Sequence, residues 1–215
     1  MKIQALGAIG AIAVAASSTH AYIRVTEAMS ASGSGGTNDW FEVTNYGSAA
    51  VDMTGFRMDD NSFNFANSVL LSGINTIGAG ETVVFVESTS SSFDFAAFRT
   101  FWGGLSGVQV GFYNGSGAGV SFSSGGDGVV VFNASGAEVT SRATFGAATT
   151  GSSFYFDLAP NNTGIVSTVG TIGTQVTFQS GTPVNTGSLG TAIGVPGPGA
   201  LALLGLAGLA ARRRR

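Results

Sequence analysis

Apolar and polar residues alternate with a period of two along much of the chain, in short runs bounded by glycine, asparagine, serine and threonine. This alternation is typical of β-strands, because successive side chains of a strand point to opposite faces. A set of short strands separated by turn residues favours an all-β sandwich or barrel. The segments that carry the pattern are 22–29, 40–46, 81–87, 108–114, 128–133, 138–145 and 174–179.

Two parts of the body depart from this alternation. The stretch FDFAAFRTFW at 93–102 predicts one short helix or 3₁₀ turn that caps an end of the sandwich. Residues 159–194 contain fewer aromatic residues and more threonine, glycine and serine. We expect one last strand at 175–178, and a flexible linker at 181–194. The sandwich is therefore expected to span residues 22–180.

The first 21 residues have the organisation of a secretory signal peptide. Lys2 supplies a positive charge, residues 3–16 form an apolar stretch, and Thr19-His20-Ala21 is a small-x-small cleavage site. About 14 apolar residues are short for a membrane span. We expect signal peptidase to cleave between Ala21 and Tyr22, so that the protein is exported.

Composition excludes several kinds of chemistry. Cleavage removes His20, the only histidine, and the chain has no cysteine. Ser-His-Asp and Cys-His nucleophiles, zinc held by histidine or cysteine, and haem with its usual axial ligands are therefore excluded. Residues 22–194 hold four arginines against all 12 acidic residues, a formal charge of −8. Such a body repels phosphate backbones, so we expect no nucleic-acid partner.

The C-terminus combines a proline-containing tetrapeptide, a short apolar run at 200–211 and a basic end. Twelve residues of helix rise only about 18 Å, against a hydrocarbon core of about 30 Å, so we expect a short membrane anchor whose arginines stay on the cytoplasmic side. A packed amphipathic helix is excluded because the run is apolar all round, whereas a plain tail anchor remains open. The tetrapeptide is Val195, Pro196, Gly197 and Pro198, and the basic end is Arg212, Arg213, Arg214 and Arg215.

These three parts, in this order, resemble the PEP-CTERM sorting signal, which an exosortase reads in bacteria. Gly197 stands where that family usually carries glutamate. The resemblance covers residues 195–215 and implies that the protein is a substrate of an exosortase-like enzyme.

The order of motifs in the body resembles the lamin tail domain over residues 22–157. The motifs are IRVTEAM, DWFEVTNYGSAAVDMTGFRMDD, IGAGETVVFVES and GGDGVVVFNASGAEVTSRATFG. The resemblance implies an immunoglobulin-like β-sandwich, a fold found in nuclear lamins and in bacterial secreted and surface proteins. Turns are expected at 45–48, 79–81 and 133–136, with a corner at Gly55-Phe56.

Acidic residues offer the remaining route to catalysis, since glycoside hydrolysis uses two carboxyl groups about 5 to 10 Å apart. The candidates do not form a convincing pair. Glu27 and Glu42 fall at strand positions expected to face solvent, and Asp39 and Asp60 flank turns. We therefore expect no enzyme activity. The candidates are Glu27, Asp39, Glu42, Asp59 and Asp60.

Two binding functions are weaker alternatives. Asp59, Asp60 and Asn61, with Asp127 in a glycine-rich loop, are weak Ca²⁺ candidates, but their spacing does not match a Ca²⁺-loop motif, so no metal or cofactor is expected. A cluster of aromatic residues would suit a carbohydrate-binding, lectin-like face, although core packing is their commoner role. These are Phe63, Phe65, Phe93, Phe95, Phe98, Phe101 and Trp102.

The sequence as a whole predicts an exported bacterial protein of the cell surface, envelope or extracellular matrix. Its sandwich is expected to be adhesive or structural, in contact with extracellular polysaccharide. The C-terminal helix would hold the protein in the membrane until an exosortase-like enzyme processes it.

Overall fold

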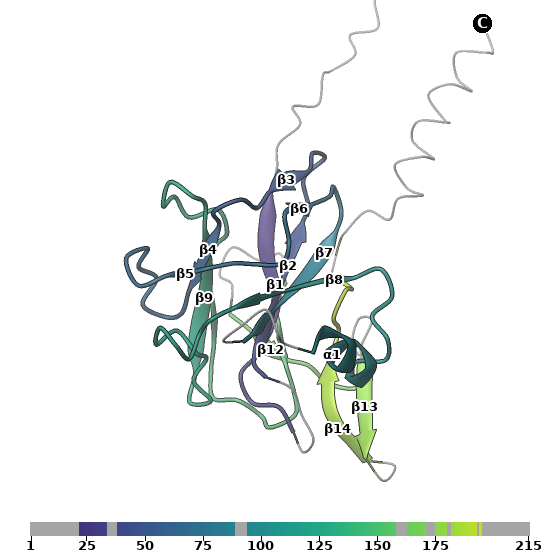
Figure 1. Ribbon diagram of the computed structural model, residues 1–215. Coiled ribbons are helices and arrows are strands. Elements are labelled where there is room, and N and C mark those ends of the chain that lie inside the picture. Colours follow the sequence, from purple (N-terminus) through teal and green to yellow (C-terminus); the bar gives the residue numbers. More distant parts are fainter. Residues whose placement is uncertain are drawn as a thin grey trace, which may run out of the picture.

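The computed structural model describes residues 22–33, 38–88, 94–157, 163–170, 175–179, 182–192 and 194. Two β-sheets pack face to face within this part of the chain, and a short helix covers the outer face of the larger sheet (Figure 1). The expected fold class, an all-β immunoglobulin-like sandwich, is confirmed.

The larger sheet has the strand order β12-β11-β1-β2-β7-β8, antiparallel except for the parallel pair β7–β8. Its central strands are the alternating segments that the sequence analysis identifies. The bounds are β1 Ile23–Met29, β2 Trp40–Asn45, β7 Thr82–Glu87, β8 Gln109–Tyr113, β11 Phe154–Tyr155 and β12 Ile165–Val166.

The smaller sheet has the order β10-β9-β4-β5. Within the expected strand at 138–145, only the last residues form β10, while Glu138 makes an isolated bridge to Phe132. Two further pairs, β3–β6 and β13–β14, lie outside the main sheets. The bounds are β3 Val51–Asp52, β4 Arg57–Asp59, β5 Val69–Leu70, β6 Thr76–Ile77, β9 Asp127–Phe132, β10 Ala143–Phe145, β13 Gln175–Gln179 and β14 Thr182–Gly187.

Turn residues act locally as their chemistry predicts. The Asn133 side chain accepts hydrogen bonds from the backbone N–H groups of Ser135 and Ala137, both at 3.0 Å, and this closes the expected turn. Gly55 has a φ of +75°, and a Cβ added there would lie 2.8 Å from Cβ of Ala134. Only glycine combines that backbone conformation with so close an approach between the corner and the turn.

The main core lies between the two sheets, where phenylalanine, valine and methionine side chains meet. A second apolar cluster lies on the other face of the larger sheet. It joins Trp40 and Val86 to Trp102 and Leu189. Both faces of the central strands are therefore covered, and every residue of β1 and β2 is buried.

Helix α1, Phe95–Phe101, supplies part of this second cover and confirms the short helix expected at 93–102. Asp94 begins it by accepting a hydrogen bond from the Ala97 N–H at 2.8 Å, as N-terminal capping residues do. Phe98 and Trp102 then point toward the sheet and are buried.

The expected flexible linker at 181–194 is wrong for its central part. Thr182–Gly187 forms β14, Thr186 exchanges backbone hydrogen bonds with Gly151 and Ser153 at 2.7 and 3.0 Å, and Leu189 is buried. The composition suggested a linker because threonine, glycine and serine are common in flexible segments. In this protein their backbone groups form hydrogen bonds with the sandwich instead. Residues 184–190, which lie on the larger sheet, are called the 184–190 segment below.

Candidate functional site

The candidate site lies at the end of the sandwich where β2 begins and β7 and β8 finish. Trp40 pairs with Val86 across the antiparallel strands β2 and β7, and Tyr113 lies beside Glu87 in the parallel pair β7–β8. Asp39 directly precedes β2, and its carbonyl oxygen accepts a hydrogen bond from the Glu87 N–H at 2.7 Å. Asp39 and Glu87 therefore stand at opposite positions of neighbouring strands.

Both acidic residues continue a row of side chains that faces the space between the sheets. Residues two apart in a strand share a face, and Phe41, Phe85 and Tyr113 all belong to the main core. The rings of Phe41 and Phe85 stack with their centroids 5.5 Å apart. Asp39 and Glu87 follow these rings at the open end of the sandwich. Like charges directly opposite one another weaken a strand pair.

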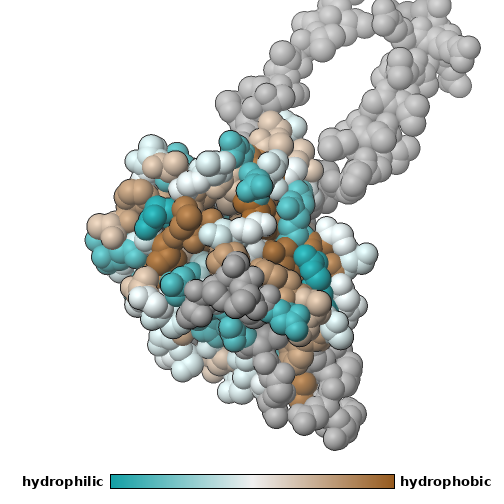
Figure 2. All heavy atoms as spheres, in the orientation of Figure 1, coloured by the Kyte–Doolittle hydropathy of each residue, from teal (hydrophilic) through white to brown (hydrophobic). Residues whose placement is uncertain are grey.

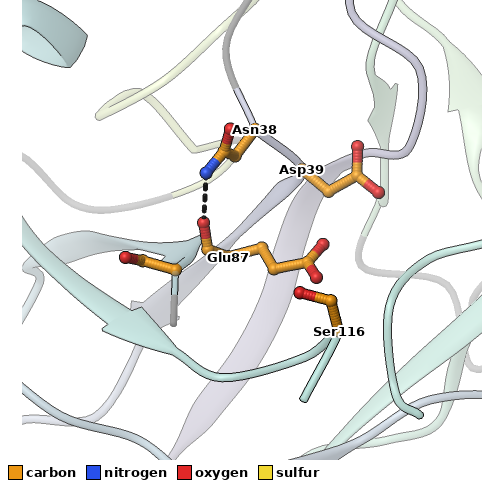
Figure 3. Close-up of a pocket in the computed structure, with 5 residues that line it drawn as sticks. Asn38, Asp39, Glu87 and Ser116 are labelled. Carbon is orange, nitrogen blue, oxygen red and sulfur yellow. Dashed lines mark hydrogen bonds between the residues drawn. The ribbon is translucent and has the colours of Figure 1, made fainter. Parts of the chain in front are cut away.

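A pocket of about 360 Å³ opens beside the two carboxylates. In Figure 3 the side chains of Asp39 and Glu87 extend to the same side, and the Glu87 carboxylate lies beside Ser116. Asn38 Nδ2 donates to the Glu87 carbonyl oxygen at 2.7 Å, and Ser121 Oγ donates to Glu87 Oε1 at 2.6 Å. The pocket therefore presents hard oxygen donors from carboxylates and hydroxyl groups.

Negative charge accumulates at this end of the sandwich. Burial raises the pKa of Asp39 to about 7, and the nearby carboxylates of Glu87 and Asp127 add to the effect. The Tyr113 hydroxyl is buried and has no hydrogen-bond partner in the described part of the chain. Burial, followed by the charges of Glu87, Asp39 and Asp127, raises the pKa of Tyr113 well above its usual value.

Asp127, a weak Ca²⁺ candidate, accepts hydrogen bonds from backbone N–H groups of two loops at this end of the molecule. Its Oδ1 accepts hydrogen bonds from the N–H groups of Asn61 at 3.1 Å and Gly128 at 2.8 Å, and its Oδ2 accepts one from the Ser123 N–H at 2.5 Å. The structure thus brings together Asn61 and Asp127, which the sequence offered as separate candidates, and the Asp127 carboxylate joins two loops through backbone N–H groups.

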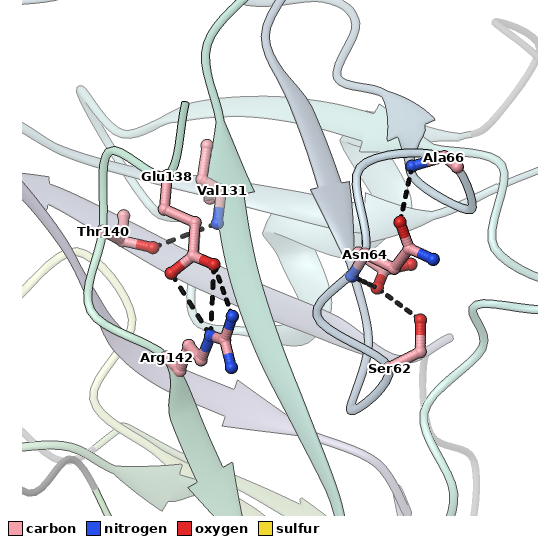
Figure 4. Close-up of polar contacts among 8 residues, drawn as sticks. Ser62, Asn64, Ala66, Val131, Glu138, Thr140 and Arg142 are labelled. Atoms are coloured by element: carbon pink, nitrogen blue, oxygen red, sulfur yellow. Dashed lines mark hydrogen bonds and ion pairs between the residues drawn. The ribbon is translucent and has the colours of Figure 1, made fainter. Parts of the chain in front are cut away.

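Asp59 and Asp60 hold the turn that follows β4, and Figure 4 labels Ser62, Asn64 and Ala66 of this turn. Asp59 Oδ2 accepts hydrogen bonds from Ser62 Oγ and the Asn64 N–H, both at 2.7 Å, and Asp60 Oδ1 accepts one from the Ser62 N–H at 3.0 Å. Asp59 Oδ1 is buried without a partner among the described residues. No group of three or more acidic or histidine side chains in the described ranges could hold a metal ion.

Glu27 and Glu42 do not face solvent, so that expectation is wrong. Both side chains are fully buried, and they stand opposite one another on β1 and β2. The 184–190 segment covers them: Ser188 donates to Glu27 through its N–H at 2.8 Å and its Oγ at 2.7 Å, and the Gly190 N–H donates to Glu42 at 2.6 Å.

Further hydrogen bonds complete this buried acidic pair. Ser153 Oγ donates to Glu27, and Thr26 Oγ1 donates to Glu42 at 2.6 Å. Burial raises the pKa of Glu27 to about 7, and burial together with the charge of Glu27 raises the pKa of Glu42 to about 8. Since neither carboxyl group is accessible, neither can touch a substrate. The pair fixes the 184–190 segment to the sheet.

Most of the described rings of the aromatic cluster pack against other parts of the sandwich. Phe98 and Trp102 are buried, Arg142 lies over the Phe63 ring at 5.0 Å from its centroid, and the exposed Phe65 packs edge-on against Phe132 with centroids 5.5 Å apart. On the face in Figure 2, hydrophobic residues form separate groups among hydrophilic ones. Core packing and local contacts therefore account for most of these rings.

Several sequence predictions concern residues outside the described ranges. These are Ala21 of the cleavage site, Phe93 of the aromatic cluster, the tetrapeptide Val195 to Pro198 and the basic end Arg212 to Arg215. Within the described ranges, no helix is long and apolar enough to cross a membrane.

Of the residues around the pocket, only Asp39 is among the candidates from the sequence. Glu87 ends the alternating segment 81–87 and Tyr113 is the second-last residue of the segment at 108–114, so both are visible as residues near strand ends. Their meeting with Asp39 depends on strand register, which no local pattern encodes.

Comparison with known proteins agrees with this architecture. The model of the lamin tail domain family matches residues 16–146, more than half of the 215 residues. The match includes strands β1 to β10, which form the whole smaller sheet and strands β1, β2, β7 and β8 of the larger one. Searches of curated proteins and of solved structures found no match. The chain belongs to the lamin tail domain family, whose immunoglobulin-like sandwich is not enzymatic.

Proposed function

We propose that the protein is an exported surface or matrix protein whose sandwich is adhesive or structural. The observation that carries the proposal is the lamin tail domain sandwich itself. It matches a non-enzymatic family, and two of its five candidate catalytic acids, Glu27 and Glu42, are enclosed between the sheet and the 184–190 segment.

Export and sorting are the second part of the proposal. Strand β1 begins at Ile23, just after the expected cleavage between Ala21 and Tyr22, and β14 ends at Gly187, before the tetrapeptide that starts at Val195. Signal peptidase and an exosortase-like enzyme would then cut outside the strands of the sandwich. The acidic body suits contact with neutral or cation-bridged extracellular polysaccharide better than contact with nucleic acid.

Intact mass and cell fractionation of the protein from its own host test the sorting proposal. We expect a species that starts at Tyr22, ends near Val195 and occurs in the envelope or the medium. A matched variant with Pro196→Ala and Pro198→Ala should keep its tail. If the native protein retains Arg212 to Arg215 in the membrane fraction, the tail is a simple anchor and the exosortase proposal fails.

The adhesive role requires a separate test in the same host. Deletion of the gene should alter cell-surface or matrix properties, such as attachment or aggregation, and re-expression of the full chain should restore them. Unchanged properties after deletion would contradict this role.

A further inference from the structure

We propose that the pocket at the open end of the sandwich is a weak Ca²⁺ site, in which the carboxylates of Asp39 and Glu87 hold the ion together with Ser116 Oγ and water. The two carboxylates stand at opposite positions of β2 and β7 and extend to the same side. Oxygen donors from carboxylates, hydroxyl groups and water are the ligands that Ca²⁺ prefers in proteins.

Among the described residues, no arginine forms an ion pair with Asp39 or Glu87. Each of the four arginines of the body makes side-chain hydrogen bonds to other partners. These contacts are Arg24 with the Asp157 carbonyl, Arg57 with Ser68, Arg99 with the carbonyls of Leu105 and Val108, and Arg142 with Glu138. Ser121 Oγ donates to one Glu87 oxygen, so protonation, solvent or a bound cation must compensate the remaining repulsion between Asp39 and Glu87.

The Tyr113 hydroxyl is an independent sign of a missing ligand. It is fully buried, it has no hydrogen-bond partner in the described part of the chain, and an unpaired buried hydroxyl is costly. Tyr113 stands beside Glu87 in the register of β7 and β8. A Cβ added at Gly115 would lie 2.9 Å from Tyr113 Cε2 and 3.0 Å from Glu87 Oε1, so the ring edge and the carboxylate both border Gly115. A water molecule bound to the cation would accept the hydrogen bond of this hydroxyl.

The same geometry favours Ca²⁺ over a neutral sugar or Mg²⁺. A sugar hydroxyl cannot neutralise two carboxylates, whereas a divalent cation can. Mg²⁺ requires near-ideal octahedral geometry and gives up its water reluctantly, while Ca²⁺ accepts irregular sets of six to eight oxygen ligands. With two carboxylates at most, we expect a dissociation constant of about 10⁻⁴ to 10⁻³ M, the range of extracellular Ca²⁺ modules.

Calorimetric titration of the purified full chain with CaCl₂ tests the site. We expect one Ca²⁺ per chain, and a thermal unfolding midpoint that rises with Ca²⁺ at about 10 mM but not with Mg²⁺ at the same concentration. Asp39→Asn and Glu87→Gln should each weaken binding at least about tenfold, because ligand charge sets the affinity of such sites. Tyr113→Phe should weaken it less, because it removes only a contact to a ligand water.

Two controls keep the result decisive. Asp60→Asn changes a neighbouring acid that holds only its own turn, so Ca²⁺ binding should be unchanged. Without Ca²⁺, Asp39→Asn should unfold at a higher temperature than the parent protein, because one of the two repelling charges is gone. The proposal requires this variant to show both the higher unfolding temperature without Ca²⁺ and the loss of stabilisation by Ca²⁺. If Glu87→Gln fails to fold, the Ca²⁺ affinity of Asp39→Asn alone tests the site.

The proposal is overturned if the folded parent protein shows neither heat nor stabilisation with Ca²⁺ at about 10 mM. It is equally overturned if Asp39→Asn and Glu87→Gln bind Ca²⁺ as the parent does. Loss of binding in Asp60→Asn alone would assign the ion to the turn after β4 and would also reject this site.

Discussion

Removal of the Glu27 carboxyl group should destabilise the protein far more than a surface substitution. Glu27 is fully buried and accepts hydrogen bonds from Ser153 Oγ and from both the N–H and the Oγ of Ser188. Glu27→Ala leaves these three donors without that acceptor, in a place that water does not reach. The 184–190 segment also loses one of its attachments to the sheet.

The magnitude follows from the donors that lose their partner. Each buried donor left unpaired costs about 1–3 kcal/mol. Ser153 Oγ keeps a contact with Ser167 Oγ at 2.7 Å, and the Ser188 hydroxyl can rotate toward another acceptor. The Ser188 N–H cannot reorient in this way, so most of the loss in the free energy of unfolding comes from this donor. We expect Glu27→Ala to lower the free energy of unfolding by about 2–5 kcal/mol. Glu27→Gln keeps an acceptor oxygen and should cost less, about 1 kcal/mol near pH 6.

The dependence on pH separates the two variants further. The pKa of Glu27 is raised from 4.5 to about 7 and that of Glu42 from 4.5 to about 8, so the folded protein holds these protons more tightly than the unfolded chain. Their contribution to stability is complete below about pH 4.5 and is lost as the pH rises through 7 to 8. For Glu27 alone the loss amounts to roughly 3 kcal/mol by pH 9. Glu27→Gln cannot ionise and should lose much less stability between about pH 6 and pH 9.

Urea unfolding followed by tryptophan fluorescence measures both effects. Trp40 and Trp102 pack edge to face, with ring centroids 5.6 Å apart, in the same apolar cluster as Leu189. They therefore report on the cover that the 184–190 segment provides. Hydrogen exchange at the Ser188 amide gives a local readout, and it should speed up in Glu27→Ala.

The reasoning is refuted by either of two results. One is a loss of less than about 0.5 kcal/mol for Glu27→Ala, the range of ordinary surface substitutions. The other is a Glu27→Gln variant that loses stability toward alkaline pH as steeply as the parent protein.

Two further predictions concern packing. Leu189→Ala should lower the free energy of unfolding in urea by about 2–4 kcal/mol, because this side chain is buried in the second cluster. The matched control Thr191→Ala changes an exposed residue and should leave the free energy of unfolding unchanged. Equal effects of the two substitutions would mean that the 184–190 segment is not packed on the sheet. Gly111→Ala should lower the thermal unfolding midpoint clearly, because its Cβ would lie 2.4 Å from the Ser72 carbonyl oxygen, a backbone atom that cannot turn away. Gly146→Ala is the matched control, since nothing lies within 4 Å of its Cβ, and a harmless Gly111→Ala would contradict the close approach.

Local patterns in the sequence located the elements well. The alternating segments at 40–46, 81–87 and 128–133 became β2, β7 and β9, because a strand that buries one row of side chains must alternate. The phenylalanine-rich stretch became helix α1. Very short strands such as β5 and β12 were missed, since two residues carry no periodicity.

The candidate site was predicted only in part, for a different reason. Asp39 was recognised as an acid that flanks a turn, but its partner Glu87 lies 48 positions away and meets it only through the register of β2 and β7. Asp127 and Asn61 were weak Ca²⁺ candidates in separate segments, and in the structure the Asp127 carboxylate accepts a hydrogen bond from the Asn61 N–H that links their two loops. The chemical role of an acidic residue depends on which groups donate hydrogen bonds to its carboxylate oxygens. In this site some of those donors are backbone N–H groups far away in the sequence.

The sequence by itself determined the β class, the lamin tail domain and the absence of histidine and cysteine chemistry, because alternation, motif order and composition are properties of the chain alone. Only the tertiary structure decided that Glu27 and Glu42 are buried. Alternation predicts two unlike faces but does not say what covers the polar one. Here the 184–190 segment, about 150 residues along the chain, covers it and donates hydrogen bonds to both carboxyl groups. Burial is a long-range property, so it emerged only when the chain had folded.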